Sequence, residues 1–356
     1  MASAQLQALQ PSQSQAQAQP QLKVLKDTNP SQNAQRKFGA AQRMIATNDL
    51  DQNLWLKYRN LGIGASDAAA ACGLSPFKSQ LELWMEKTGR IEPAQPSDTE
   101  DSPLLWGSVL EPIVAEHYAK RTQSKVRRVN AILQHSKCQW MIANLDREVQ
   151  GGEVSILECK TAGVHSAKHW ANGVPEYIQL QVQHQLAVTG FEAADVAVLI
   201  GGQQLQIHRV RRDEELIANL IQLEQTFWQR VKSDTPPAAD ASASSDRALR
   251  QLYPQDNHEL IDLSEDRPLN QAYERLLSLR GEIKALTKEE AAIKHQLQQA
   301  MGDASIARLK AGRVSWKRSK PATAFDHKAF QEEHPELFGD YQIPKMGTRR
   351  FLVQPD

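Results

Sequence analysis

The sequence predicts an α/β fold in which a layer of strands is flanked by helices. Residues 125–163 contain a cluster of short apolar stretches separated by turn residues, which is typical of strands. Residues 104–123, before this cluster, carry apolar side chains at helical spacing, and residues 175–190, after it, are expected to form a further helix. With 356 residues, 40% of them hydrophobic, the chain is long enough for one large domain and an accessory one. A strand cluster between helices indicates an α/β layer fold.

The first segment, residues 1–45, is rich in Gln, Ala, Ser and Pro, and we expect disorder because it has little apolar surface to bury. A folded domain is predicted over residues 46–233. Its elements are expected in this order: a short helix through Trp55, a glycine turn, an Ala-rich helix capped by Ser66 or Asp67, a helix over 79–89, the helix over 104–123, strands within 125–135, 138–152 and 153–163, the helix over 175–190, a strand hairpin over 194–212 and a closing helix over 213–233.

The rest of the chain is predicted to be a linker, residues 234–255, and a C-terminal accessory region, residues 256–356. A long helix is expected from Leu269 to Met301, with apolar residues at alternating steps of three and four, the pattern of a coiled-coil seam. The sequence leaves open whether this helix self-associates, lies on the domain or folds back on a neighbour. Basic strands are expected over 307–321 and 347–354, and six Lys or Arg residues in the first of them favour contact with nucleic acid.

Composition excludes several classes of protein. The 42 basic and 42 acidic residues balance, so the total charge indicates no polyanion partner, although a local basic groove can exist within a neutral total. Cys72, Cys138 and Cys159 lie far apart, which argues against a disulfide framework, a zinc knuckle or a four-cysteine iron–sulfur cluster and favours a reducing compartment. No apolar run approaches the ~20 residues of a membrane span, so no membrane partner is expected.

Charged residues end two neighbouring strands of the predicted cluster. Glu158 and Lys160 are separated only by Cys159, and they share one face because strand side chains alternate. Asp146 ends the preceding apolar strand, and a tight Gly-Gly hairpin would place it beside them. Two carboxylates can hold a hard divalent cation that activates water for phosphodiester hydrolysis, and a lysine can stabilise charge on the phosphoryl oxygens. Glu-x-Lys alone also occurs as a simple ion pair, so the hypothesis depends on Asp146 and on the buried strand.

Further stretches surround these residues in a specific order over residues 51–232: "RNLGIGASDAAAACGLSPFKSQLELWMEKTG", "WGSVLEPIVAEHY", "MIANLDREV", "ILECKTAG" and "YIQLQVQHQLAVTG". With this combination the sequence resembles the YqaJ-like viral recombinase family, the phage-type alkaline exonucleases that include lambda exonuclease, within the PD-(D/E)xK nuclease superfamily. The resemblance implies a restriction-endonuclease-like core, a mixed central sheet flanked by helices. This sequence differs from the family pattern at two positions. Leu145 stands where the superfamily name implies proline, and His184 stands where the glutamine motif often carries tyrosine.

The resemblance also implies roles for single residues around the predicted metal site. Asp146 and Glu158 match the metal-binding carboxylates, and Lys160 matches the catalytic lysine. The backbone carbonyl of Cys159 is at the position of a further metal ligand. Glu111 matches a helix glutamate that assists the metal or its water, although on its own it is more typical of a helix salt bridge or cap. The metal implied is Mg²⁺ or Mn²⁺.

Three more residues are assigned by the resemblance. Gln181 matches the glutamine that positions the site, although the register could slip to Gln179 or Gln183 in this glutamine-rich helix. Arg59 and Ser66 match residues that receive the 5′-phosphate of a DNA end. An arginine fork and a serine beside helix N–H groups would form an anion pocket.

The resemblance implies a metal-dependent DNA exonuclease that digests double-stranded DNA from a 5′ end and leaves a 3′ single strand for homologous recombination by annealing. It implies DNA ends and a single-strand annealing recombinase of the RecT or Red-beta type as partners, a homo-oligomer (a toroidal trimer in some members), and the cytoplasm of a bacterial or phage-infected cell. Two alternatives stay open: a PD-(D/E)xK endonuclease acting on branched or specific DNA, and a non-catalytic DNA-binding or assembly protein.

Overall fold

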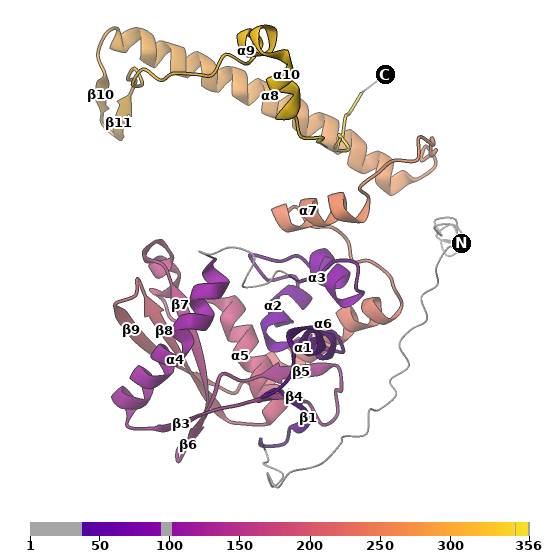
Figure 1. Cartoon of the computed structure of the whole chain (residues 1–356), viewed down its shortest axis with the longest axis vertical. Helices are drawn as coiled ribbons and strands as arrows, with labels where there is room; N and C mark the ends of the chain where they lie inside the picture. The colour runs from indigo at the N-terminus through magenta and orange to yellow at the C-terminus, as the bar shows by residue number, and fades with distance from the viewer. Residues whose placement is uncertain (1–37, 94–101, 346, 355–356) are drawn as a thin grey trace. The chain divides into compact units, whose positions relative to one another are not determined.

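The computed structural model of the chain describes residues 38–93, 102–345 and 347–354, so most of the segment predicted to be disordered lies outside the described residues. The described residues divide into two compact units, the first ending at Ala238 and the second beginning at Ala239, which Figure 1 shows in indigo to salmon and in salmon to yellow. Within the described ranges, no helix is both long and apolar enough to cross a membrane.

A five-stranded mixed sheet forms the centre of the first unit, with strand order β3-β6-β7-β8-β9. β7 and β8 run parallel, and the other neighbouring strands run antiparallel. Helices α4 and α5 cover its two faces (Figure 1). This mixed sheet with helices on both faces confirms the predicted fold class. The bounds are β3 (Lys125–Arg128), β6 (Arg147–Gln150), β7 (Val154–Ala162), β8 (Ala193–Ile200), β9 (Gln204–Arg211), α4 (Pro103–Thr122) and α5 (Glu176–Thr189).

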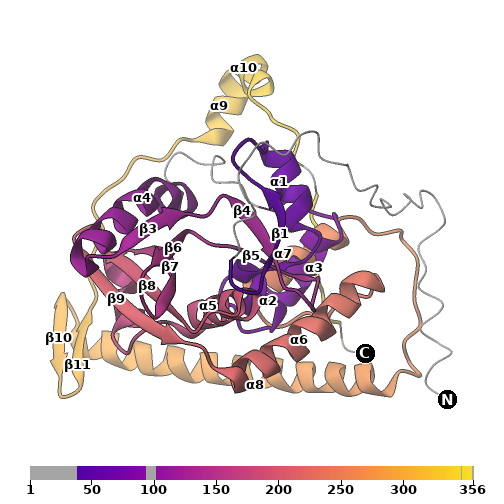
Figure 2. The same cartoon turned by 90° about the horizontal axis from the view of Figure 1, so that it is seen from below.

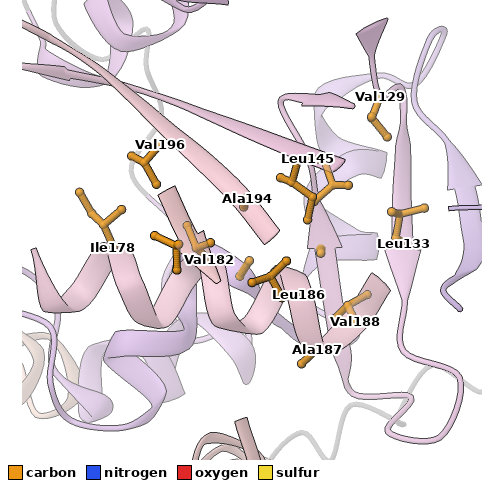
Figure 3. Packing of buried hydrophobic residues seen from close by; sticks show 14 of the residues in the cluster. Val129, Leu133, Leu145, Ile178, Val182, Leu186, Ala187, Val188, Ala194 and Val196 are labelled. Carbon is orange, nitrogen blue, oxygen red and sulfur yellow. The ribbon is translucent and has the colours of Figure 1, made fainter. Parts of the chain in front are cut away.

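The alternation of side chains along β7 and β8 explains why both faces are covered. Neighbouring residues of a strand point to opposite faces. Ile156 packs in the cluster that contains α5, whereas Leu157 packs with α4. In β8, Val196 belongs to the α5 cluster and Ala197 to the α4 cluster. Figure 3 shows the α5 side, where Ile178 and Val182 of α5 lie next to Val196 of β8. β8, which is buried on both sides, accordingly has an almost continuous apolar sequence that only Asp195 interrupts.

A second sheet of four strands has the order β1-β4-β5-β2. The two stretches predicted to hold strands, 125–135 and 138–152, each contribute one strand to each sheet. The chain crosses between sheets after β3 and after β5, where no glycine or proline marks the break. β1 lies inside the segment expected to be disordered; its pairing with β4 and the buried Phe38 overturn that expectation at this end. The bounds are β1 (Gln42–Ala46), β2 (Ile63–Gly64), β4 (Ala131–Gln134) and β5 (Met141–Asn144).

Two further helices of the first unit, α2 and α6, pack against α5. The Ala-rich helix α2 lies against α5 and α6, and α3 lies against α2 and α6. Small alanine side chains permit this close approach of helices. Neither Ser66 nor Asp67 caps α2 through its side chain, which corrects the sequence-based expectation. The bounds are α1 (Gln52–Arg59), a 3₁₀ turn (Ala65–Asp67), α2 (Ala68–Ala71), α3 (Gln80–Lys87), a second 3₁₀ segment (Val164–Trp170) and α6 (Glu214–Lys232).

The second unit is built on one long helix, α8, with 35 residues, followed by the antiparallel hairpin β10–β11 (Figure 2). Asp266 caps α8 by accepting the Leu269 N–H, and proline occupies its first turn. Within the predicted linker, α7 is helical. The described part of 347–354, expected to form a basic strand, is not in a strand. The bounds are α7 (Ala243–Leu252), α8 (Arg267–Met301), β10 (Ile306–Leu309), β11 (Gly312–Ser315), α9 (His327–Glu333) and α10 (Pro335–Asp340).

Candidate active site

The hairpin of β6 and β7 brings Asp146 beside the charged end of β7, as the sequence predicts. Arg147 of β6 pairs with Leu157 of β7, so the next position on each strand brings Asp146 opposite Glu158. The Asp146 Oδ2 atom accepts a hydrogen bond from the Cys159 N–H over 2.8 Å. The strand register and this hydrogen bond thus bring Asp146 next to Glu158 and Cys159, which lie 12 and 13 positions later in the sequence.

Glu158 is held by three donors on the α5 face of the sheet. Its side chain is 3% exposed, and its Oε1 lies 2.7 Å from the Lys160 Nζ. The Gln181 Nε2 donates to the same oxygen, and the Gln185 Nε2 donates to Oε2 over 2.7 Å. Lys160 also donates to the Gln181 Oε1 over 3.0 Å. Glu158, Lys160 and Gln181 therefore form a closed triangle of hydrogen bonds.

The helical register of α5 selects Gln181 from its neighbouring glutamines. Gln179 donates to a backbone carbonyl at the start of the helix, and Gln183 donates to the Arg211 carbonyl. Gln185, which the sequence analysis did not identify, lies one turn after Gln181, and residues four apart share one face of a helix. The spacing of four residues from Gln181 is the feature of the sequence that indicates Gln185 as a further site residue.

Glu111 approaches from α4, on the other face of the sheet. Its Oε1 forms an ion pair with the Arg147 Nη1 at 2.5 Å. Arg147 was not identified from the sequence, although strand alternation places the residue after Asp146 on the opposite face. Cys159 likewise packs its side chain among the α4 cluster.

The electrostatics of the site favour a bound cation. Burial raises the pKa of Asp146 well above its usual range, and the charges of Glu158 and then Glu111 raise it further, against the opposing effects of Lys160 and the Cys159 N–H. Burial alone would lower the pKa of Lys160, but the charges of Glu158 and Asp146 outweigh it and raise the pKa. Lys160 is therefore an ammonium, and the site holds two positive groups, Lys160 and Arg147, beside the three carboxyl groups of Asp146, Glu158 and Glu111.

The donors present fit a hard divalent ion by their chemistry. Carboxylate and carbonyl oxygens are the ligands of Mg²⁺. The N–H and C=O of one strand residue point to the same neighbour, so the Cys159 carbonyl lies on the side of Asp146. Among the described residues, no group of three or more His, Cys, Asp or Glu side chains is arranged to hold a metal. In this structure the carboxylate oxygens of Glu158 accept hydrogen bonds from Gln181 and Gln185, and Glu111 is paired with Arg147.

Arg59 and Ser66 form a second cluster, as the sequence analysis anticipated. The Arg59 Nη2 donates to the Ser66 Oγ over 2.8 Å, and its guanidinium lies 4.9 Å from the Trp55 ring centroid. The Asp67 Oδ2 lies 3.5 Å from the Arg59 Nη2 and 2.8 Å from the Lys87 Nζ. A Cβ on Gly64 would lie 3.3 Å from Asp67 and 3.4 Å from Arg59. Glycine at this position thus leaves room beside the guanidinium.

Strand pairing relates the two clusters. β2 and β5 are parallel, with Gly64 opposite Ile142. Ser66 follows β2 and Asp146 follows β5, so both leave the carboxyl ends of adjacent parallel strands. Ligand-binding groups gather at such ends in α/β folds. The fold thus directs the cluster of Arg59 and the cluster of Asp146 to the same edge of the sheet.

The position that often carries tyrosine in the family motif is occupied here by His184, which is fully buried and away from Glu158. Its Nδ1 lies 2.7 Å from the Glu224 Oε1, and its Nε2 lies 3.0 Å from the Ile142 carbonyl oxygen. His184 therefore ties α5 to α6 and β5 and makes no contact with a group of the candidate site.

Asp67 provides a prediction for the pH dependence of stability. Burial alone would raise its pKa, but Lys87, Arg59 and Lys78 outweigh burial and hold the pKa well below its usual range. The Asp67 carboxylate therefore stabilises the folded state fully at pH values above its pKa in the unfolded chain, about 3.9. This stabilisation is lost as the pH falls through the pKa of Asp67 in the folded chain. Asp67→Asn should lower the free energy of unfolding by about 2 kcal/mol at pH 7.

Urea titrations from pH 2.5 to pH 7 should show this difference between Asp67→Asn and the unaltered chain shrinking below about pH 4. A difference that stays constant over this range would contradict the assignment. Asp49→Asn, at an exposed position, is the matched control and should leave stability unchanged.

Comparison with known proteins agrees with the family resemblance. The model of the YqaJ-like viral recombinase domain matches residues 54–192. The "Uncharacterized protein YqaJ" of Bacillus subtilis (strain 168) is 33% identical over 321 residues, 88% of this chain and 98% of that protein.

Two solved structures show lower similarity. The alkaline exonuclease LHK-Exo from Laribacter hongkongensis has a TM-score of 0.42 at 19% identity, covering 52% of this chain and 94% of that one. A phage-related exonuclease from Haemophilus somnus 129PT has a TM-score of 0.37 at 10% identity, covering 51% and 99%. The relationship rests instead on the 33% identity to the Bacillus subtilis protein over almost its entire length, together with the matched domain. By these two measures, the chain belongs to the YqaJ-like viral recombinase family.

Proposed function

We propose that the chain is a metal-dependent deoxyribonuclease that degrades duplex DNA from 5′ ends. The observation that carries this proposal is the triangle of Glu158, Lys160 and Gln181 beside Asp146, at the end of two strands. Carboxylates paired with a protonated lysine suit hydrolysis of a phosphodiester, in which negative charge builds up on the phosphoryl oxygens. Membership of the YqaJ-like family supports the same class of reaction.

The carboxylates of Asp146 and Glu158 and the carbonyl of Cys159 would hold Mg²⁺ or Mn²⁺, assisted by Glu111. When bound, such a cation polarises the phosphoryl group and lowers the pKa of a bound water. Lys160 contributes a fixed ammonium that stabilises charge on the phosphoryl oxygens. Gln181 orients that ammonium, because its Oε1 accepts from Nζ while its Nε2 holds Glu158.

The arginine cluster supplies the preference for 5′ ends in this proposal. Arg59 and Lys87 carry two positive charges against the single negative charge of Asp67, which leaves the cluster net positive. Asp67 and Ser66 fix the guanidinium, and a preorganised fork binds phosphate oxygens well. Breaking the P–O3′ bond releases a nucleotide and leaves a new 5′-phosphate on the shortened strand, so the cluster can be used again at each step.

The remaining parts of the proposal concern partners and location. The 3′ single strand left by digestion is the substrate of a single-strand annealing recombinase, which we propose as the partner. Self-assembly, such as a trimer around DNA, and a cytoplasmic location belong to the same proposal. Mass measurement in solution and co-purification with an annealing protein would test these parts separately from the chemistry.

The substrate test compares three duplexes of the same sequence: linear with 5′-phosphate, linear with 5′-hydroxyl, and covalently closed circular. The 5′-phosphorylated duplex should be degraded fastest and the circle should stay intact in Mg²⁺. Rapid cutting of the circle would favour the endonuclease alternative. Inactivity with Mg²⁺, Mn²⁺ and other divalent metals would favour a non-catalytic DNA-binding protein.

Arg59→Gln gives a sharper form of the same test. It removes the charged fork, so the advantage of a 5′-phosphate over a 5′-hydroxyl should fall about tenfold, the effect of losing one charge-assisted hydrogen bond. The rate on the 5′-hydroxyl substrate should change much less. Lys57→Gln, on the exposed side of the same helix, is the matched control. An equal loss on both substrates would assign Arg59 to general DNA binding or to folding.

A further inference from the structure

The hairpin β10–β11 concentrates positive charge in a chain whose net charge is zero. Residues 304–325 contain no acidic residue. They carry six basic ones, all exposed: Arg308, Lys310, Arg313, Lys317, Arg318 and Lys320. This stretch lies outside residues 54–192, which the family model matches. No role in the proposed nuclease chemistry uses it.

The two faces of the hairpin differ. Ala307 and Val314 pair across the strands and are half-buried, whereas Arg308 and Arg313 pair on the other face and are exposed. Like charges directly opposite each other destabilise a strand pair. Within the part of the chain that the structure describes, neither arginine forms an ion pair. Two uncompensated arginines on one solvent-facing surface indicate an anionic ligand.

We propose that the Arg308–Arg313 face of this hairpin, with Lys310 and Lys317 at its ends, is a second DNA-binding surface that contacts the phosphates of duplex DNA. The identity of the polyanion rests on the proposed nuclease function. Arginine forks bind phosphate oxygens in a bidentate manner, and a two-stranded ribbon fits the major groove of B-DNA. The surface is tethered to the candidate active site through the chain, so it raises the effective concentration of DNA there.

The position of Trp316 favours duplex over single-stranded DNA. Proteins that bind single strands stack bases on aromatic side chains. The backbone N–H of Trp316 donates to the Ser305 carbonyl, which adds one more residue pair to the hairpin. Because side chains alternate along a strand, the Trp316 ring lies on the same face as Val314, opposite to the arginines. The basic face therefore offers charge without a stacking platform, which suits a phosphate backbone.

The test measures equilibrium binding of a labelled blunt duplex by fluorescence anisotropy, without divalent metal and with EDTA, from 50 to 200 mM KCl. The full-length variant Arg308→Gln/Arg313→Gln/Lys317→Gln should bind at least ~10-fold more weakly at 100 mM salt. Its slope of log K against log salt should be shallower by about 2–3, since each phosphate contact contributes about 0.9. The KM for cleavage should rise, while the single-turnover rate at saturating DNA stays unchanged.

The matched control removes three exposed charges from α8, as Arg280→Gln/Lys284→Gln/Lys288→Gln. It should keep the affinity and the slope of the unaltered chain. Three results would overturn the proposal: an equal loss of duplex affinity in both triple variants, unchanged affinity in the hairpin variant, or no binding of duplex DNA by the unaltered chain. A loss confined to single-stranded DNA would overturn the assignment to duplex.

The two proposals fail in distinguishable ways. If the unaltered chain binds duplex through the hairpin but cleaves no DNA with any divalent metal, the nuclease function is wrong and the binding surface stands. If it degrades DNA normally and the hairpin variant binds as tightly as the control, the surface is wrong and the nuclease function stands.

Discussion

Lys160→Met should lower the single-turnover rate of DNA cleavage by about 10²–10³-fold, the size of effect expected when a preorganised charge at a developing oxyanion is removed. Binding of duplex DNA in metal-free buffer should stay within about twofold, since one charge near a phosphate contributes little to a large interface. The ratio between these two effects is the informative quantity. It separates stabilisation of the transition state from attraction of the substrate.

The structure explains why methionine is the suitable replacement. Methionine fills the volume of the lysine stem, and Glu158 keeps both glutamine donors when the ammonium is lost. The nuclease unit should therefore still fold, which a thermal melt would check. Lys168→Met is the matched control, an exposed lysine in the segment that follows β7. It should cleave at the rate of the unaltered chain.

Asp146→Asn extends this test to the metal. Asparagine can still accept the Cys159 N–H bond, so the hairpin should persist while one negative charge is lost. Cleavage should fall by at least about 10²-fold, and more Mn²⁺ or Mg²⁺ should be needed for half-maximal rate. If either Lys160→Met or Asp146→Asn degraded DNA at the unaltered rate, the assignment of the active site would be wrong.

The sequence predicts the centre of the site because that centre depends on local rules. The period of two along β7 places Glu158 and Lys160 on one face, and a tight turn brings Asp146 back to them. The family resemblance assigns Gln181 to the site. In the structure, the helical register of α5 directs Gln181 to Glu158 and Lys160, whereas Gln179 and Gln183 bond elsewhere. Each step uses a repeat or a turn that is visible in the sequence.

The supporting residues follow a different rule, because their partners are distant in sequence. Arg147 pairs with a glutamate 36 residues earlier, and Gln185 bonds to a glutamate 27 residues earlier. Lys87 donates to the Arg59 carbonyl, 28 residues earlier, and is also paired with Asp67. No periodicity links such positions. The division of the strand cluster into two sheets was missed for the same reason, since strand partners are set by long-range packing.

The largest effect on stability should come from the buried pair of His184 and Glu224. Both side chains are fully buried, and the pair joins α5 to α6. Burial raises the pKa of Glu224, and the His184 charge opposes that rise. Glu224→Ala leaves the His184 Nδ1 without its partner in a dry interior. It should lower the free energy of unfolding of the first unit by about 3–5 kcal/mol, the typical cost of breaking a buried pair on one side.

Urea unfolding followed by tryptophan fluorescence can measure this loss on the first unit alone. Six of the seven tryptophans lie before residue 239, so a Trp316→Phe background removes the signal of the second unit. Glu215→Ala, exposed on the same helix, is the matched control and should change stability by less than about 0.5 kcal/mol.

A double-mutant cycle separates the pair from simple loss of volume. His184→Phe removes the ring nitrogen that faces Glu224. The double variant Glu224→Ala/His184→Phe should therefore lose about 1–3 kcal/mol less stability than the sum of the losses in the two single variants. The Ile142 carbonyl loses its donor in both variants that carry phenylalanine, and this cost cancels in the cycle. Strict additivity would mean that Glu224 stabilises the helix contact by packing alone. The histidine would then be a neutral donor to β5, and its distance of 2.7 Å to the carboxylate would contribute no coupling.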